Sequence, residues 1–408
     1  IIKNAHEHAE PGIFFIDNHK RNDALAYINP AITTNPCGEQ FLGAYANCLL
    51  GHMNLDKYVL TMDNGPKDTT KVTLGFGYED FANDIKTAVR FLDNCIDWNK
   101  GKHALPQQEK TAAGERRIGL GITGLGDCLI RLGVKYDSEE ALAVVEKIMT
   151  TYRDAAYAAS VELAEKKGAF PWYDKNKWLG SEFTNKWHEH CLGEISEKFD
   201  KTGIRNSFLL TVAPVGSGSI IGQVSSGIEP IFATSYTRRV RQQDGKKFKE
   251  FKTYPKIINE LFGDDTNLPE YVVTAHDVDP YFRVKLQAVI QKYVDNSISS
   301  TVNLSNETKP ETIADIYVNA WKLGLKSITV YREGSREGVL ITEPKDVPPT
   351  ELDSKLRPKR PIVIQGKTFK IPSGPEEKLY ITINPFPDRP DSPYEIFISS
   401  YGADNPEI

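Results

Sequence analysis

The sequence predicts a mixed α/β fold followed by a small β module. Short apolar runs typical of buried strands, such as residues 13–17 and 326–332, alternate with longer segments whose apolar residues recur at helical spacing. A Pro- and charge-rich stretch over residues 342–361 is typical of a linker. With 408 residues and 40% apolar side chains, the chain can bury a large core, which we expect within residues 1–341.

The N-terminal quarter contains one clear helix and several shorter patterns. Residues 13–17 follow a Pro-Gly turn and predict a strand, with Asp17 at its end satisfying a turn. We expect a buried strand over residues 44–55 and a loop over residues 62–78. From Glu79 to Trp98 the apolar residues recur at helical spacing, and Cys95 lies on that apolar stripe, which indicates a core position.

The middle of the chain opens with a glycine-rich segment at residues 116–127. No acidic residue follows at the distance that a dinucleotide-binding fingerprint requires, so its glycines are better explained by close packing of a strand against a helix, with Cys128 in the core. Ser138 and the acidic residues after it predict a helix that runs to about Lys167. We expect residues 170–201 to form a surface excursion, in which Cys191 is a surface thiol rather than a metal ligand.

The remaining segments return to the strand and helix patterns. An apolar strand at residues 209–215 leads into a Gly/Ser turn and then a helix, and a helix over residues 310–323 has Pro in its first turn. Strands are expected at 299–304 and 326–332. The β module over residues 362–408 contains four short strand patterns, at 362–364, 368–371, 379–383 and 394–398.

Composition excludes several classes of protein. A net charge of −5 and a pI of about 6.0 provide no basic field for nucleic acid, and no apolar run is long enough to span a bilayer. Five cysteines without a C-x-x-C pair, and without a zinc-like spacing, favour reduced thiols in the cytoplasm. The chain begins at Ile1 and contains three methionines, so we expect a fragment or the second polypeptide of a split enzyme.

The most informative stretch is Asn35-Pro36-Cys37-Gly38-Glu39. If it is extended, the alternating geometry places the amide, the thiol and the carboxylate on one face, where they can act on one small substrate. A thiol can give up its hydrogen atom, a carboxylate can take a proton from a hydroxyl, and an amide can hold that hydroxyl. Pro36 and Gly38 favour a tight loop tip that projects into a cavity. The simpler alternative is a turn with a buried cysteine and a capping Asn.

A second constellation is the turn Pro214-Val215-Gly216-Ser217-Gly218-Ser219 between the predicted strand and helix. Exposed backbone N–H groups, hydroxyls and a helix start are the features that bind phosphate. No Lys follows, so this is not a P-loop. Taken alone, such a turn is also compatible with a plain loop.

Together these segments resemble the ribonucleotide reductases. The resemblance covers residues from about Pro11 to the end and rests on motifs in the family order: the P-G-I-x-F-I-D strand, the N-P-C-G-E finger loop over residues 34–49, the R-R-I-G-L-G segment, the A-P-T-G-S/T-x-S turn and S-x-T-V-N. It implies a ten-stranded α/β barrel of two five-stranded parallel halves around a central finger loop. This chain would supply mainly the second half, followed by a shortened β module.

The resemblance also implies roles for individual residues. Cys37 would become a thiyl radical that takes the substrate 3′-hydrogen, Glu39 would deprotonate the 3′-hydroxyl and Asn35 would hydrogen-bond it. Cys48, eleven positions beyond Cys37, would supply one reducing equivalent in a spacing familiar from the cobalamin-dependent class II enzymes. The Pro214–Ser219 turn would hold the substrate phosphates, although Val215 stands where Thr is common.

The implied reaction reduces a ribonucleoside di- or triphosphate to its 2′-deoxy form, with adenosylcobalamin as radical source. The partners would be the ribonucleotide, dNTP or ATP effectors, a thioredoxin-like or small dithiol reductant, and an N-terminal half barrel that carries the cysteine partner of Cys48. The sequence is also compatible with a homodimer. No nucleic acid, membrane or metal ligand is expected.

Three other functions are alternatives to a class II reductase. A class I large subunit would need a tyrosine pair near Thr329 and Val330, where no tyrosine stands, and Tyr331 is single. A non-catalytic fragment that binds nucleotides or a partner subunit is favoured by the missing first redox cysteine. The third alternative is a glycyl-radical enzyme on the same barrel. The sequence argues against it, because it contains no C-terminal segment of the R-V-x-G-Y type.

Overall fold

The computed structural model describes residues 1–63, 71–241, 248–335, 366–372, 378–386 and 389–401. The chain divides into two compact units, residues 1–343 and residues 344–408. The predicted linker over 342–361 and the predicted strand at 362–364 lie outside the described residues.

The larger unit is built on a layer of parallel segments. Strand β4 (Leu50–Asn54) pairs in parallel with β7 (Gly119–Thr123), β7 bridges in parallel to the segment around Leu210, and that segment bridges to Ile298. The run continues into β10 (Thr301–Leu304), which pairs in parallel with β11 (Ser327–Arg332). At the far edge β1 (Ile13–Phe14) pairs antiparallel with β11. Within the described residues the layer is open and does not close into a barrel.

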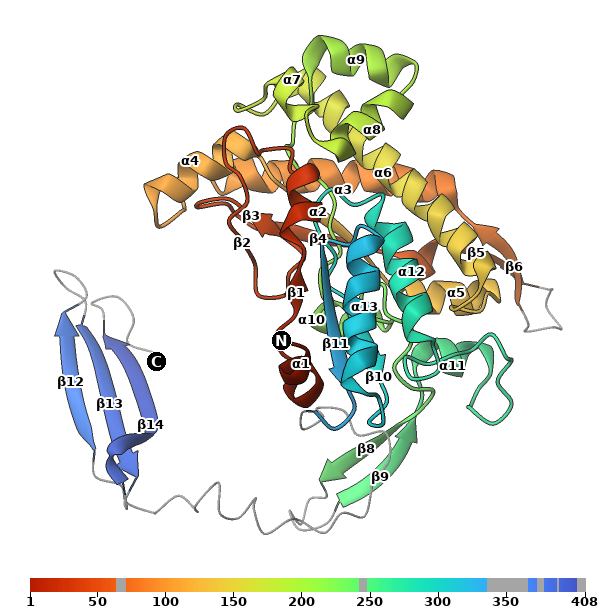
Figure 1. The fold of residues 1–408 in the computed structure, drawn as a ribbon, viewed down its shortest axis with the longest axis vertical. Coiled ribbons are helices and arrows are strands. Elements are labelled where there is room, and N and C mark those ends of the chain that lie inside the picture. The colour runs from red at the N-terminus through yellow and green to blue at the C-terminus, as the bar shows by residue number, and fades with distance from the viewer. Residues whose placement is uncertain (64–70, 242–247, 336–365, 373–377, 387–388, 402–408) are drawn as a thin grey trace. The chain divides into compact units, whose positions relative to one another are not determined.

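Helices connect these segments and cover the layer. The helices that follow one another along it are α3 (Tyr78–Trp98), α6 (Glu139–Lys167), α12 (Pro280–Gln291) and α13 (Pro310–Lys322), and each packs against the next (Figure 1). In α3 the buried residues Phe81, Ile85, Val89 and Leu92 recur at helical spacing. In α6 the Ser138 side chain accepts a hydrogen bond from Ala141 N at 3.1 Å, which caps the predicted start. The α/β class and the predicted helices α3, α6 and α13 are confirmed, whereas α12 was not predicted.

Glycines let β7 and α5 (Leu125–Leu132) approach their neighbours closely. A Cβ added at Gly126 would lie 2.9 to 3.0 Å from backbone atoms of residues 229–231, and one added at Gly119 would lie 2.6 Å from Gln40 Nε2. All five residues of β7 are buried, as is Cys128 on α5. The core position of Cys128 is therefore confirmed. The glycines do allow close packing, but against neighbouring strands and residues 229–231 rather than of a strand against a helix.

Several local expectations are wrong. The described parts of the predicted loop over residues 62–78 are not a loop, because β5 (Val59–Asp63) and β6 (Lys71–Phe76) form an antiparallel pair. Of residues 44–55, the extended part is β4, and residues 44–49 are irregular. The strand at residues 13–17 ends after Phe14, and Asp17 lies in the first turn of α2 (Ile16–Arg21), where it accepts a hydrogen bond from Trp321 Nε1 at 2.8 Å. Cys95 is half-buried rather than in the core.

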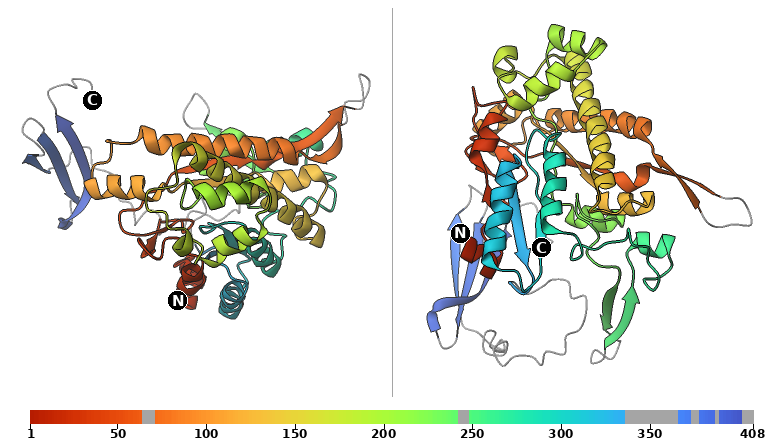
Figure 2. Two further views of the ribbon diagram at one scale, coloured as in Figure 1. Left: turned by 90° about the horizontal axis from the view of Figure 1, so that it is seen from above. Right: turned by 45° about the vertical axis from the view of Figure 1, so that its right-hand side comes forward.

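Residues 170–201 are more than a surface excursion. They form three short helices, α7 (Lys175–Trp178), α8 (Glu182–His190) and α9 (Glu194–Thr202), at one end of α6 (Figure 2). Their buried side chains Trp178, Phe183, Trp187 and Phe199 pack as an aromatic cluster. Because these aromatic residues are divided among short helices, no single long pattern in the sequence predicted that they form a buried cluster. Cys191, just after α8, is half-buried.

The remaining elements of the larger unit are short. They are α1 (Ile2–His8), β2 (Thr33–Thr34), β3 (Phe41–Leu42), a 3₁₀ turn (Leu55–Tyr58), α4 (Pro106–Glu115), α10 (Gly216–Gly222), β8 (Tyr236–Arg241), β9 (Phe248–Thr253) and α11 (Lys256–Leu261). The second unit is a three-stranded antiparallel sheet in the order β12 (Lys367–Pro372), β13 (Lys378–Phe386), β14 (Arg389–Tyr401). Its strands contain the three predicted strand patterns that fall within the described residues.

Buried charges join the parallel segments at their centre. Asp295 is 1% exposed and accepts hydrogen bonds from the backbone N–H groups of Leu209 and Leu210, at 2.7 and 2.9 Å. Lys326, 2% exposed, donates to the backbone carbonyls of Asp295 and Asn296. Burial lowers the pKa of Lys326 to about 8, although the carboxylates of Asp295 and Asp23 oppose the shift.

This buried lysine predicts a specific pH dependence of stability. Below about pH 8 Lys326 is charged in both the folded and the unfolded chain, so the cost of burying the charge is present in full. Between the folded pKa and the ordinary value of 10.5 the unfolded chain binds more protons, so the parent protein gains stability as pH rises. Relative to Lys326→Met, the parent should gain up to about 3 kcal/mol across this window. Denaturant unfolding of both proteins at several pH values measures the difference, and parallel curves would contradict the assignment.

Candidate functional site

The Asn35–Glu39 stretch lies at the tip of a β-hairpin. Thr33 and Thr34 of β2 pair antiparallel with Phe41 and Leu42 of β3. Gly38 N donates to the Asn35 carbonyl at 3.0 Å, and Gly38 has a φ of 79°. The expectation of a loop tip is confirmed, but the expectation of an extended stretch is wrong, because Pro36 and the left-handed Gly38 bend the backbone into a turn.

The turn places the three side chains in different environments. The Asn35 side-chain oxygen accepts a hydrogen bond from Gln40 N at 2.9 Å, so it closes the turn while its amide N–H groups stay able to donate to a substrate. Cys37 is exposed. Glu39 is only 2% exposed, and its Oε2 has no hydrogen-bond partner among the described residues. An unpaired buried carboxylate oxygen of this kind is suited to accept a proton.

Both candidate thiols experience the charge of Glu39. Burial, and after it the negative charge of Glu39, raises the pKa of Cys37. The same two causes raise the pKa of Cys48 to about 11, against the opposing effect of the Arg117 guanidinium. Both thiols are therefore within the electrostatic influence of one carboxylate, and both stay as S–H at neutral pH. A protonated thiol is a poor nucleophile but retains the hydrogen atom that radical chemistry uses.

The hairpin tip is fixed to the parallel layer through its backbone. The Glu39 carbonyl accepts hydrogen bonds from Thr211 Oγ1 at 2.8 Å and from Ser297 N at 3.0 Å. Ser327 of β11 donates to the Gly38 carbonyl at 3.4 Å. Three different segments of the layer thus determine where the tip lies.

The Pro214–Ser219 turn differs in detail from the expected arrangement. Helix α10 begins at Gly216, so the Gly/Ser residues form its first turn rather than a loop before it. Pro214, Gly216, Ser217 and Gly218 are exposed. Val215 is buried, and the Ser219 hydroxyl donates to the Gly216 carbonyl at 2.9 Å, so the turn offers backbone N–H groups and the Ser217 hydroxyl to a ligand.

Sequence reasoning missed two polar residues that pack against β7, Gln40 of the hairpin and His52 of β4. Gln40 is completely buried, and both polar atoms of its amide lack a partner among the described residues, as does His52 Nε2 on β4. They lie over Gly119 and Gly121 of β7, whose missing side chains leave them room. In the sequence, only the alternating glycines Gly119 and Gly121 indicated that other side chains pack against this face of β7.

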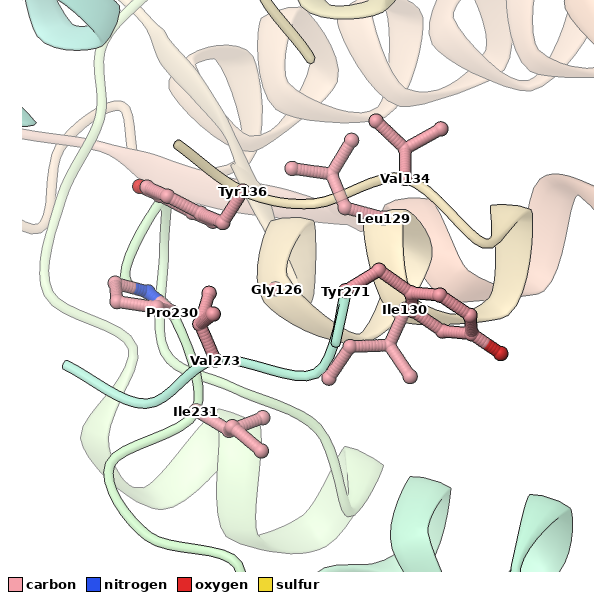
Figure 3. Close-up of a pocket in the computed structure, with 9 residues that line it drawn as sticks. All are labelled: Gly126, Leu129, Ile130, Val134, Tyr136, Pro230, Ile231, Tyr271 and Val273. Carbon is pink, nitrogen blue, oxygen red and sulfur yellow. The ribbon is translucent and has the colours of Figure 1, made fainter. Parts of the chain in front are cut away.

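An apolar hollow elsewhere in the larger unit is not part of this site. It lies between α5 and residues 230–231 and 271–273, and Figure 3 shows its lining: Gly126, Leu129, Ile130, Val134, Tyr136, Pro230, Ile231, Tyr271 and Val273. None of the predicted site residues lines it. The lining side chains offer almost nothing to orient a polar ligand.

The described residues contain neither a metal-binding cluster nor a membrane-spanning helix. No group of three or more His, Cys, Asp or Glu side chains there is arranged to hold a metal ion. Of the helices described, none has both the length and the apolar character needed to cross a bilayer.

Comparisons with known proteins agree with the motifs. Residues 1–331 match the family model of the ribonucleotide reductase barrel domain. The chain is 35% identical over 362 residues to a vitamin B12-dependent ribonucleoside-diphosphate reductase of Thermoplasma acidophilum, covering 84% of this chain and 43% of that protein. It is 33% identical over 364 residues to the protein of the same name from Mycobacterium tuberculosis, covering 84% and 47%.

A more distant match is the ribonucleoside-diphosphate reductase subunit alpha of Treponema pallidum, at 28% identity over 260 residues, covering 62% of this chain and 28% of that protein. The chain spans a little under half the length of the two B12-dependent relatives. The family model covers most of the chain and agrees with these relatives. The chain belongs to the ribonucleotide reductase family, of which residues 1–331 carry the barrel domain.

Proposed function

We propose that this chain carries the catalytic thiol of a ribonucleoside-diphosphate reductase that makes 2′-deoxyribonucleotides through a cysteine thiyl radical. The names of its B12-dependent relatives support the reaction and the diphosphate substrate. The observation that carries the proposal is the hairpin tip, where an exposed and protonated Cys37 lies in the field of the buried Glu39 carboxylate.

In this proposal each residue at the tip has one role. Cys37, as a thiyl radical, takes the 3′-hydrogen, Glu39 takes the proton of the 3′-hydroxyl, and the Asn35 amide donates a hydrogen bond to that oxygen. The carbon radical beside C2′ makes the 2′-hydroxyl leave as water. Cys48 and a second thiol give two electrons and two protons and become a disulfide, and Cys37 recovers its hydrogen atom from the substrate.

The second thiol is expected from outside this chain. Cys95 lies on α3, Cys128 is buried on α5, and Cys191 follows α8. Helical positions outside a barrel cannot bring a Cα within about 7 Å of a strand inside it, as a disulfide requires. We therefore propose that an N-terminal half barrel completes a ten-stranded fold and carries the partner of Cys48.

The exposed first turn of α10 is proposed to hold the substrate phosphates. Its first N–H groups have no partner within the helix, and a phosphate can accept from them and from the Ser217 hydroxyl. Helix α10 begins five residues after Thr211, whose hydroxyl donates to the Glu39 carbonyl, so one segment supports both parts of the site.

Adenosylcobalamin is the proposed radical source, as the names of the two B12-dependent relatives suggest. When bound it supplies the organic radical chemistry that no side chain provides. The residues present fit such a group in that the Cys37 thiol is exposed at the turn and keeps its hydrogen at neutral pH. The tyrosine pair of a class I large subunit does not fit, since Thr329 and Val330 stand on β11 and Val330 is buried.

The first test concerns Cys37. In the complete enzyme, Cys37→Ser should reduce deoxynucleotide formation to background while substrate affinity stays nearly unchanged, because a hydroxyl does not form the radical. Cys191→Ser is a matched control that should retain turnover. Product formation and equilibrium binding are the two measurements. Appreciable turnover by Cys37→Ser would contradict the assignment of Cys37 as the radical-bearing thiol.

The second test concerns the phosphate site. A Cβ at Gly216 meets no atom within 4 Å, so Gly216→Val should fold normally yet block the approach of a phosphate. Nucleotide affinity should fall at least about tenfold, or about 1.4 kcal/mol. Gly222→Ala, at the other end of α10 where an added Cβ makes ordinary contacts of 3.5 Å or more, should leave affinity unchanged. Equal affinities in both variants would refute the site.

The third test concerns the cofactor. The complete enzyme should become active when adenosylcobalamin and a dithiol are added, with no second metalloprotein, because the chain lacks the tyrosine pair at residues 329–330. Deoxynucleotide formation is measured with each component left out in turn. Activity that needs an iron or manganese subunit and ignores cobalamin would show that the radical source is wrong.

A further inference from the structure

Two adjacent buried arginines point to different parts of the molecule. Arg116 and Arg117 are 6% and 5% exposed. The Arg116 guanidinium pairs with Asp93 and Asp97 of α3, both at 2.7 Å. The Arg117 guanidinium instead pairs with Glu115 at 3.1 Å and stacks on the Phe208 ring. Both guanidinium groups are buried and each pairs with a buried carboxylate, Asp93 or Glu115, but only that of Arg117 contacts the hairpin.

Arg117 holds the limb of the hairpin that follows Cys37. Its Nη1 donates to the Phe41 carbonyl on β3 at 2.8 Å and to the Asn296 side-chain oxygen at 3.2 Å. Asn296 precedes Ser297, whose N–H donates to the Glu39 carbonyl. One guanidinium therefore contacts both the hairpin and the segment that holds its tip.

Glu115 extends this contact to the end of the hairpin. Its Oε1 accepts from Asn29 Nδ2 at 2.5 Å, and the same amide lies 3.2 Å from the Ala44 carbonyl. A Cβ at Gly43 would lie 2.4 Å from the Asn29 side chain, so Gly43 lets the chain pass against this amide. The Arg117–Glu115 pair thus fixes residues 41 to 44 directly or through Asn29.

We propose that Arg117, together with Glu115, is a positioning residue that fixes the hairpin and thereby sets the place of the Cys37 thiol relative to the Glu39 carboxylate. The importance of that placement rests on the proposed function of Cys37. The guanidinium does not need to touch the substrate, since it acts through the backbone of Phe41 and the side chain of Asn296.

The test compares two double variants of the same kind in the full chain. Removing one partner would leave a buried unpaired charge and could prevent folding, so both charges of each pair are neutralised. Arg117→Met with Glu115→Gln removes the pair that holds the hairpin. Arg116→Met with Asp93→Asn removes the neighbouring pair on α3. Both are expected to lower the melting temperature, which provides the control for general destabilisation.

Two readouts report the hairpin without requiring turnover. The amides of Gly38 and Gln40 close the tip with hydrogen bonds of 3.0 and 2.9 Å, so their hydrogen exchange should become severalfold faster in the Arg117/Glu115 variant. Alkylation of Cys37 by iodoacetamide should also become severalfold faster, because a loosened tip is better solvated and less constrained beside Glu39. The Arg116/Asp93 variant should keep the parent rates at both places, and Cys191 should react equally in all three proteins.

Equal exchange and alkylation in the two double variants would overturn the proposal. In the complete enzyme the Arg117/Glu115 variant should lose about 10- to 100-fold in kcat at a nearly unchanged KM, and Arg117→Lys, which keeps a charged donor, should recover part of it. A loss of kcat as large in the Arg116/Asp93 variant would also count against positioning. Since exchange and alkylation are measured without substrate, their outcome is independent of whether Cys37→Ser abolishes turnover.

Discussion

The candidate site depends on one buried backbone carbonyl, that of Glu39. A two-stranded hairpin of this size has little stability of its own and needs support from a larger structure. That support comes from Thr211 and Ser297, which donate to this oxygen from two neighbouring segments of the parallel layer. The order of the segments, the closely packed glycines of β7 and the central Asp295 all serve to place these two donors side by side.

The electrostatics of the site favour one kind of cysteine chemistry. Nucleophilic cysteines lie near cations or helix N-termini that lower their pKa. Here burial and the Glu39 carboxylate raise the pKa of both Cys37 and Cys48, while Arg117 only partly opposes this at Cys48. The local field therefore keeps both thiols protonated at neutral pH, which is the form that the proposed radical chemistry needs. A site for ionic thiol chemistry would need the opposite arrangement of charge.

Local sequence patterns were sufficient for the parts of the fold that local physics determines. The apolar stripe of α3, the Ser138 cap and the proline in the first turn of α13 each correspond to structure within a few residues of the expected bounds. Pro36 and Gly38 predicted a loop tip, but the pairing of β2 with β3 depends on contacts with distant segments and was not visible. Arg117 was overlooked for the same reason, since its partner Asn296 lies 179 residues away.

The two limbs of the hairpin are held very differently. On the returning limb the carbonyls of Glu39, Phe41 and Ala44 are bound by surrounding residues, whereas on the outgoing limb Thr33, Pro36 and Cys37 are exposed. The sulfur is thus carried by the free side of the turn and the carboxylate by the fixed side. The contacts that hold the returning limb reach the Cys37 thiol only through the hydrogen bonds that close the turn between Asn35, Gly38 and Gln40. The position of the sulfur thus depends on the geometry of the turn, whereas that of the carboxylate depends directly on the parallel layer.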